Sequence, residues 1–269
     1  MIGSVYRSFH IPESDIPAGA IPLDIAQYLE AQGLLWPKAD GARLELCARA
    51  PLSDGLEDIR TALHKAGMIG PARSELMALR LVPDGPELAV IDRSAVRVLG
   101  LWVHKVHVNG LVQGSGPPRV WLSRRAAHAE WNANRFDTLV AGGCAAGHDI
   151  EQTVRLEGWQ EAGLTPAKLA DLKPVSRLSV QYPSERGFLR EVLIIFDLGL
   201  PDNFTPHCHD GEIDWAQRVS LDELQALLAV STEMKLSSAL VCRDLLRRLG
   251  HVPTVTVGPS PAAQGGTGR

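Results

Sequence analysis

Several features are scarce in this chain of 269 residues, and each scarcity argues against one class of protein. The chain has only four cysteines, Cys47, Cys144, Cys208 and Cys242, which form no CxxC pair and show no spacing typical of a disulfide scaffold. No apolar run is long enough to span a bilayer, and the N-terminus lacks a basic segment followed by an apolar core. We therefore expect free thiols, a cytoplasmic location and no membrane partner.

A strong net charge is also missing. The 27 Lys and Arg residues nearly balance the 31 Asp and Glu residues, which gives a net charge of −4 with both signs mixed along the chain. This distribution does not favour nucleic acid as a partner, and a polyanionic ligand would have to be attracted by local groups. With 45% hydrophobic and 22% charged residues, the composition is that of an average globular protein.

The most informative stretch runs from Ala141 to Leu164. A short apolar run, Phe136–Val140, precedes it and has the character of a β-strand. Gly142, Gly143 and Gly147 then predict a loop in which the backbone can approach a ligand closely.

A helix should follow this glycine loop. Asp149 is a suitable N-cap, Gln152 completes a loose capping box, and Gly163 suits the position that ends the helix. The predicted inner face has small or apolar residues at helical spacing: Ile150, Val154, Gly158 and Ala162.

Three polar residues share another face of this helix. Glu157, Gln160 and Glu161 stand at i, i+3 and i+4, so their side chains lie side by side. Two carboxylates and an amide suit Mg²⁺, which prefers oxygen ligands and is usually shared with water and substrate phosphates. The alternative is a solvated helix face that carries acids by chance, because such faces are common.

At these residues the chain resembles a Nudix hydrolase. Gly142 matches the first glycine of the Nudix box, Glu157 the first and Glu161 the last Glu of the metal-binding cluster, and Gly163 and Leu164 the closing pair. The departures are His148 for the early Glu, Leu156 for the Arg, Gly158 for the aliphatic residue and Gln160 for the middle Glu.

The flanks of the box extend the resemblance to about His251. The runs FDTLVAGG, VHVNGLV, VWLSRRA and ERGFLREVLIIFDLGLPDNFTPHCHDGEI are similar to one Nudix branch. That branch is related to the Nudix-like part of fungal thiamine pyrophosphokinase and has plant and bacterial relatives. It also lacks the early Glu, so His148 is an expected departure, whereas Gln160 predicts weaker metal binding and slower turnover. The run IDRSAVRVLGL resembles the leader domain of the same branch.

The resemblance implies an α/β fold, a Nudix α/β/α sandwich with a mixed sheet, preceded by a small α+β domain. We place the leader at residues 1–104, with helices expected over Asp24–Gln32 and Ser53–Lys65. The Nudix domain should occupy residues 105–252. Residues 253–269 are rich in Pro, Gly, Ala and Thr and predict a disordered tail.

The implied activity is hydrolysis of a diphosphate linkage, with Mg²⁺ or alternatively Mn²⁺ as cofactor. Glu157, Gln160 and Glu161 would hold the metal, and Glu212 looks like the distal Glu that serves as base or further ligand. Thiamine diphosphate or a damaged analogue, cleaved to the monophosphate, is the substrate that the branch suggests. The rivals are hydrolysis of ADP-ribose or another nucleoside diphosphate, and a binding protein weakened in catalysis by Gln160. A monomer and a homodimer are both compatible with the sequence.

The substrate diphosphate should meet residues on either side of the predicted box. Gly142 and Gly143 would let phosphates approach the backbone. Arg124 and Arg125 end the predicted strand Val120–Arg124, and a guanidinium matches phosphate oxygens bidentately. The alternative is that both arginines are solvated charges at a strand end.

Other residues carry weaker hypotheses. Glu191 begins an apolar strand and is either a surface charge, which we favour, or a second metal ligand. Trp159 is either a platform for a flat ring or an ordinary exposed or core residue. His207, Cys208 and His209 suggest zinc only weakly, since no second ligand cluster is in view. His10 is expected at the surface.

Overall fold

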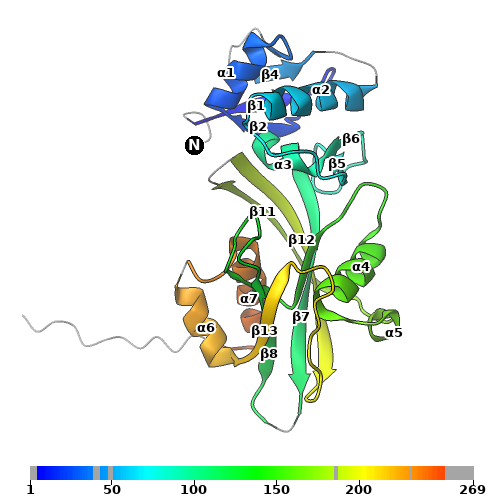
Figure 1. Ribbon diagram of the computed structural model, residues 1–269, viewed down its shortest axis with the longest axis vertical. Helices are drawn as coiled ribbons and strands as arrows, with labels where there is room; N and C mark the ends of the chain where they lie inside the picture. Colours follow the sequence, from blue (N-terminus) through cyan, green and yellow to red (C-terminus); the bar gives the residue numbers. More distant parts are fainter. Residues whose placement is uncertain are drawn as a thin grey trace, which may run out of the picture.

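The structure is a computed structural model that describes residues 5–38, 43–47, 51–114, 116–184, 187–230 and 232–251. Two bodies are stacked along the long axis of the molecule, a smaller N-terminal one and a larger one built on a long twisted sheet (Figure 1). We call residues 5–101 the leader unit and residues 102–251 the sheet unit, because one buried apolar cluster ends at Leu101 and the next begins at Trp102.

The domain limits set from the sequence stay a prediction, and the expected tail, residues 253–269, lies outside the described residues. The first limit, at residue 105, falls inside a strand that already begins at Trp102. Within the described part of the chain, no helix is both long enough and apolar enough to cross a membrane.

The leader unit starts with a four-stranded sheet in the order β2-β1-β4-β3, in which β1 and β4 are parallel. Two helices complete its apolar core, in which Leu56, Ile59 and Leu63 of α2, at helical spacing, are fully buried. The elements are β1 (Tyr6–His10), β2 (Gly19–Pro22), α1 (Leu23–Ala31), β3 (Leu35–Pro37), β4 (Arg43–Leu46) and α2 (Leu52–Lys65).

The leader unit ends in a strand pair and a short helix that lie next to the large sheet (Figure 1). The Asp92 carboxylate caps the helix by accepting a hydrogen bond from the Ser94 amide at 2.9 Å, and it also accepts bonds from the amides of Arg73 and Ser74. Gly100 ends the helix with φ 63°, a left-handed conformation that favours glycine. These elements are β5 (Leu76–Leu79), β6 (Ala89–Asp92) and α3 (Arg93–Leu99).

The sheet unit is a mixed sheet in the order β11-β12-β7-β8-β13, with β10 paired to β7 and β9 to β8. β12 and β7 are parallel over their whole shared length, and the other pairings are antiparallel. Its strands are β7 (Trp102–Gln113), β8 (Arg119–Arg125), β9 (Phe136–Thr138), β10 (Val140–Gly143), β11 (Pro174–Ser184), β12 (Gly187–Pro201) and β13 (Ile213–Ser220).

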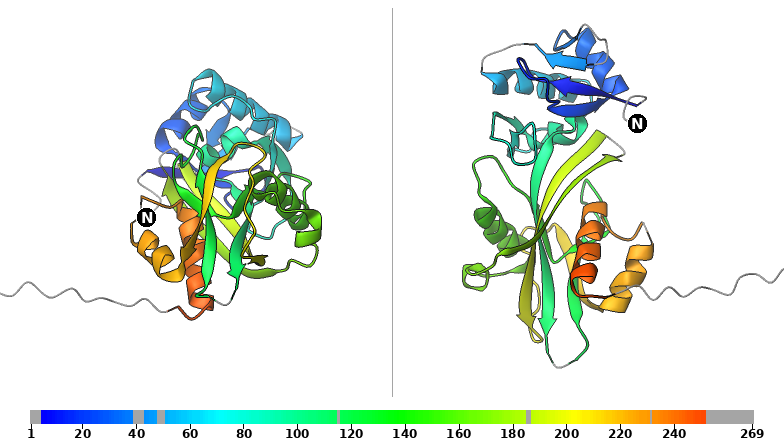
Figure 2. Two further views of the ribbon diagram at one scale, coloured as in Figure 1. Left: turned by 60° about the horizontal axis from the view of Figure 1, so that its bottom comes forward. Right: turned by 180° about the vertical axis from the view of Figure 1, so that it is seen from behind.

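Helices cover both faces of this sheet (Figures 1 and 2). Alternate residues of β12 explain why: Val192 and Ile194 belong to the apolar cluster shared with α4, whereas Leu193 and Ile195 pack with Val241 of α7. The fold is therefore an α/β/α sandwich, as the sequence predicted. The helices are α4 (Ile150–Ala162) and α5 (Pro166–Leu169) on one face, and α6 (Leu221–Ala229) and α7 (Leu236–Arg248) on the other.

The leader unit rests on the first residues of β12. Arg190 donates a hydrogen bond to the carbonyl of Ala18 at 3.0 Å, and its guanidinium lies 4.7 Å from the Trp102 ring centroid. The Tyr6 hydroxyl donates to the carbonyl of Gly187 at 3.1 Å. These contacts hold the start of the leader unit against β12.

Two local expectations were wrong. Gly142 and Gly143 do not form a loop but belong to β10, where they pair with Val106 and Lys105 of β7. His10 is 3% exposed, because β1 lies inside the leader unit and the imidazole meets the Ser8 hydroxyl at 3.1 Å. Neighbouring strands decided both positions, and a single segment of sequence does not reveal which strands are its neighbours.

Candidate active site

One large cavity, of about 640 Å³, lies where the leader unit meets the sheet unit. The walls carry charged side chains of both signs. The carboxylates are those of Glu75, Glu130, Glu157, Glu191, Asp210 and Glu212, and the cationic groups are those of Arg73, Arg93, Arg97, Lys105, Arg125 and Lys235.

Helix α4 presents the predicted acidic face to this cavity. Its start is a complete capping box, in which the Asp149 carboxylate accepts from the Gln152 amide at 2.7 Å and the Gln152 side chain accepts from the Asp149 amide at 2.9 Å. Its end is Gly163, with φ 65°. Both predicted ends are confirmed, and Glu157 and Gln160 between them line the cavity.

Gly142 makes room for Glu157. A Cβ atom at this position would lie only 2.0 Å from the carboxyl carbon of Glu157, so the helix side chain lies directly against the strand backbone. At Gly143 the nearest atom to such a Cβ would be the Met77 methyl carbon at 3.6 Å, an ordinary contact. Both glycines line the cavity, but only the first is required for close packing.

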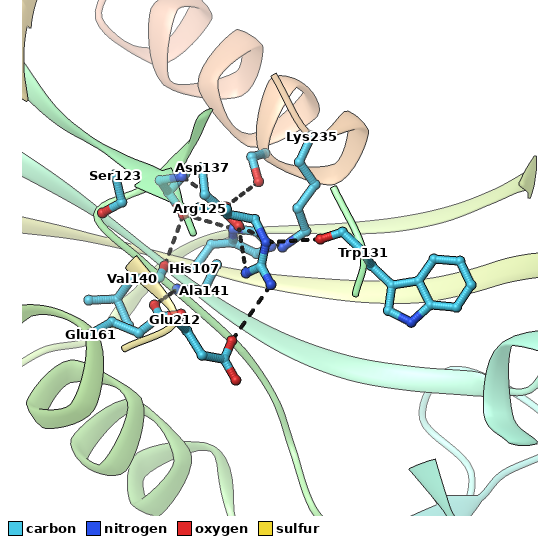
Figure 3. A network of polar contacts seen from close by, with 12 residues as sticks. His107, Ser123, Arg125, Trp131, Asp137, Val140, Ala141, Glu161, Glu212 and Lys235 are labelled. Atoms are coloured by element: carbon cyan, nitrogen blue, oxygen red, sulfur yellow. Dashed lines mark hydrogen bonds and ion pairs between the residues drawn. The ribbon is translucent and has the colours of Figure 1, made fainter. Parts of the chain in front are cut away.

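Glu161 is buried beside the cavity rather than at its surface. Its carboxylate is 4% exposed and accepts a hydrogen bond from the Ala141 amide at 2.7 Å (Figure 3). Burial raises the pKa of Glu161 well above its ordinary value, and the neighbouring charge of Glu157 raises it further. The pKa of Glu157 is also raised, first by burial and then by repulsion from Glu212, Glu75 and Asp210.

Glu212 lies in the loop before β13 and faces the same cavity. Its carboxylate is 55% exposed and lies 3.6 Å from the Arg125 guanidinium (Figure 3). The same guanidinium donates to the Trp131 carbonyl at 3.2 Å. The structure thus brings together Glu157, Gln160, Glu212 and Arg125, which are at most 87 positions apart in the chain.

The two predicted strand-end arginines point to different places. Arg125 lines the cavity, whereas the Arg124 guanidinium lies 4.6 Å from the Phe136 ring centroid and 3.4 Å from the Glu233 carboxylate. Successive side chains of a strand point to opposite faces, so only one of the two can reach a ligand in the cavity.

The sequence missed most of the cationic wall. Lys105 of β7 forms an ion pair with Glu191, which also accepts a hydrogen bond from the Tyr182 hydroxyl at 2.8 Å. Glu191 is 1% exposed, so the favoured assignment to the surface was wrong: its carboxylate contacts Lys105 and Tyr182 of the two neighbouring strands. Attraction to Lys105 outweighs burial and lowers the pKa of Glu191. Period-2 alternation alone could have shown that Lys105 and His107 share a face, but not what that face meets.

Lys235 is held at the cavity by a second buried group. The Asp137 carboxylate is 1% exposed, lies 2.8 Å from the Lys235 amine and accepts a hydrogen bond from Ser238 at the start of α7 (Figure 3). Burial alone would raise the pKa of Asp137, but the charge of Lys235 and its neighbours lowers it to about 2. The buried carboxylate therefore stays charged and ties α7 to β9.

Other sequence candidates lie outside the acidic wall. Trp159 is 47% exposed, and its ring stacks on the His209 imidazole with the centroids 4.3 Å apart. His207 meets the edge of the same imidazole. The Cys144 thiol is buried, which raises its pKa to about 11 and keeps it protonated.

A family model described as "NUDIX domain" matches residues 103–240, a little over half of the 269-residue chain. This protein belongs to the Nudix family. Two curated relatives from Arabidopsis thaliana are "Nudix hydrolase 24, chloroplastic", 29% identical over 190 residues, and "Nudix hydrolase 20, chloroplastic", 27% identical over 195 residues. The alignments cover 71% and 72% of this chain and 52% of each relative, so the chain spans about half the length of the curated relatives it matches.

Among solved structures, the crystal structure of DR0079 from Deinococcus radiodurans is similar with a TM-score of 0.43 and 19% identity. The match covers 65% of this chain and 96% of that one.

The acidic wall of this Nudix domain fits a divalent cation. Burial and then repulsion from neighbouring carboxylates raise the pKa of Glu157, and a cation beside it would offset both effects. Its carboxylate and the Gln160 amide supply oxygen ligands, the kind that Mg²⁺ prefers. In the residues that the structure describes, no group of three or more His, Cys, Asp and Glu side chains is placed to hold a metal ion. Oxygen atoms of water and substrate would therefore have to complete the coordination of the cation, as is usual for Mg²⁺.

Proposed function

We propose that this chain hydrolyses a diphosphate linkage, with Mg²⁺ or alternatively Mn²⁺ as the cofactor. The observation that carries the proposal is a cavity whose lining includes both carboxylates, among them Glu157 and Glu212, and cationic groups, among them Arg125 and Lys105. A diphosphate needs both, because its oxygens bind metal and also accept charge-assisted hydrogen bonds.

Each residue has a distinct role in this proposal. Glu157, Gln160 and Glu161 would hold the cation, Glu161 from its buried position beside the Ala141 amide. When bound, the cation neutralises charge on the diphosphate and lowers the pKa of a water molecule. Glu212, partly exposed in the cavity, accepts the proton of the attacking water or serves as a further ligand. The water oxygen forms the new bond to phosphorus as the bridging P–O bond breaks.

For the substrate we propose thiamine diphosphate or a damaged analogue, which would leave as the monophosphate. This rests on the resemblance of the chain to the Nudix-like part of fungal thiamine pyrophosphokinase. The first test is calorimetric titration of thiamine diphosphate in Mg²⁺, followed by product analysis of the same sample. Binding with release of phosphate and the monophosphate supports the proposal. If a parallel panel of diphosphates shows conversion of ADP-ribose alone, ADP-ribose replaces thiamine diphosphate as the proposed substrate.

A specific observation favours a second candidate, a Nudix-fold binding protein. Gln160 stands at the cavity wall where the box has a Glu, so the site has one negative charge fewer for the cation. Under this candidate the wild-type chain binds a diphosphate without converting it. Gln160→Glu should then raise turnover from near zero, whereas in a competent hydrolase the same change should produce a modest gain. The two outcomes are separated by phosphate release at saturating substrate.

A further inference from the structure

Helix α3 of the leader unit reaches the cavity of the Nudix domain. Arg93 and Arg97 are four residues apart, so they share one face of the helix, and both line the cavity together with Ser94. Figure 1 shows α3 directly above the ends of β7 and β12, between the two bodies of the molecule. The leader unit is therefore part of the site wall.

Arg93 lines the same cavity as the acidic residues Glu157 and Glu212. One guanidinium nitrogen lies 2.6 Å from the Glu75 carboxylate, and the side chain keeps 40% of its surface exposed. Its pKa is raised, since attraction to Glu75, Glu212 and Glu157 outweighs the burial that would lower it. Beyond its own partner, the carboxylates that attract Arg93 thus belong to the proposed catalytic set.

The position of α3 is fixed before any ligand arrives. Asp92 caps the helix, and a Cβ atom at Gly187 of β12 would lie only 2.3 Å from the Arg97 carbonyl oxygen, so helix and strand are in close contact. A residue held in this way loses little further conformational freedom when it binds a ligand.

The leader unit also holds the loop between β8 and β9 that forms another part of the wall. Arg73 forms an ion pair with Glu130, and the Arg97 guanidinium lies 4.0 Å from the Trp131 ring centroid. Both contacts join the leader unit to residues that line the cavity.

We propose that Arg93 is a substrate-binding residue, which the leader unit contributes to the Nudix site to bind a phosphate oxygen of the diphosphate. The inference deepens the proposed function and rests on it. Glu75 holds one edge of the guanidinium, and the exposed remainder offers further N–H donors toward the cavity. The Nudix domain alone would then lack one of the cations that bind its substrate.

The test is calorimetric titration of inorganic pyrophosphate in Mg²⁺ into the full chain and its variants. Arg93→Met should weaken binding about 10- to 100-fold, the scale of a lost hydrogen bond to a charged group. Arg93→Lys should weaken binding less, because the positive charge remains although the paired N–H donors of the guanidinium are lost. Arg119→Met is the matched control: Arg119 is 38% exposed and lies 2.7 Å from Asp202, away from this cavity.

A double variant separates direct binding from the charge left on Glu75. If Arg93 only neutralises Glu75, then Arg93→Met combined with Glu75→Gln should bind pyrophosphate as tightly as the wild type, which would overturn the inference. If Arg93 binds the phosphate, the double variant should stay weak, and Glu75→Gln alone should bind at least as well as the wild type.

The two proposals fail in different ways. Unchanged affinity of Arg93→Met beside a wild type that binds pyrophosphate would overturn the role of Arg93 and leave the hydrolase proposal standing. A wild type that binds neither pyrophosphate nor any diphosphate of the panel would overturn both. Equal losses in Arg93→Met and Arg119→Met would show a general loss of structure and would also count against the inference.

Discussion

The two walls of the cavity are built from the chain in different ways. The acidic wall comes mainly from one helix, where Glu157 and Gln160 are neighbours because of helical geometry alone. The cationic wall is assembled from separate elements, with Arg93 on α3, Lys105 on β7 and Arg125 on β8. A local motif can therefore mark half of a site, while the other half depends on which strands and helices become neighbours.

The largest effect should come from breaking the support of the cationic wall. Asp137→Asn leaves Lys235 beside a neutral partner in a buried place, and loss of a buried ion-pair partner costs about 3–5 kcal/mol. We expect a decrease of that size in the free energy of unfolding measured with denaturant at neutral pH. Asp202→Asn is the control: its carboxylate is 61% exposed and pairs with Arg119, so the loss should stay below about 1 kcal/mol.

The same carboxylate gives this prediction a pH dependence. The folded pKa of Asp137, about 2, lies below its unfolded value of about 3.9, so its stabilisation is complete above that unfolded value. It is lost as the pH falls through about 4 toward 2. The difference in stability between wild type and Asp137→Asn should therefore shrink over this range. A difference that stays constant would contradict the assignment.

The next effect is on catalysis at the acidic wall. Glu157→Gln removes the charge that we assign to the metal and keeps the shape of the side chain. We expect turnover to fall at least about 100-fold, the scale for one electrostatic group in an active site. The measurement is phosphate release at saturating substrate and Mg²⁺. Unchanged turnover would refute the metal assignment, and thermal unfolding of the variant checks that the fold is kept.

A pair of neighbouring glycines tests how closely the acidic helix lies on the sheet. Gly142→Ala places a methyl group in the space of the Glu157 side chain and should cost about 1–3 kcal/mol of stability as well as activity. Gly143→Ala meets only the Met77 methyl at ordinary contact distance, so its cost should stay within about 0.5 kcal/mol. Denaturant unfolding of both variants measures the difference, and equal losses of stability would show that Glu157 does not lie against Gly142.

The smallest effect separates the two arginines that end β8. Arg125→Met removes a cation from the cavity wall and should raise KM about tenfold, the scale of one hydrogen bond to a charged group. Arg124→Met, whose guanidinium lies on the Phe136 ring, should change KM by less than about twofold. Steady-state kinetics of the two variants under one set of conditions measures the difference. A larger effect at Arg124 would mean that the substrate binds on the other side of β8.

The ends of the acidic helix were predictable because their signals are local, and the fold class followed from the resemblance of the box and its flanks to the Nudix family. Asp149, Gln152 and Gly163 fix the ends of α4 through short-range hydrogen bonds and a left-handed backbone position, so the sequence placed this helix correctly. That Gly142 and Gly143 belong to a strand was not predictable. Glycines favour loops, and only pairing with β7 extends the strand through them.

The sequence by itself determined the acidic helix and its caps. These features depend on residues a few positions apart. Only the tertiary structure decided that Arg125 rather than Arg124 faces the cavity, that Glu191 is buried, and that Arg93 reaches the site from the leader unit. The physical reason is that these positions depend on strand pairings and domain contacts between residues far apart in the chain. The periodicity of one segment carries no information about such contacts.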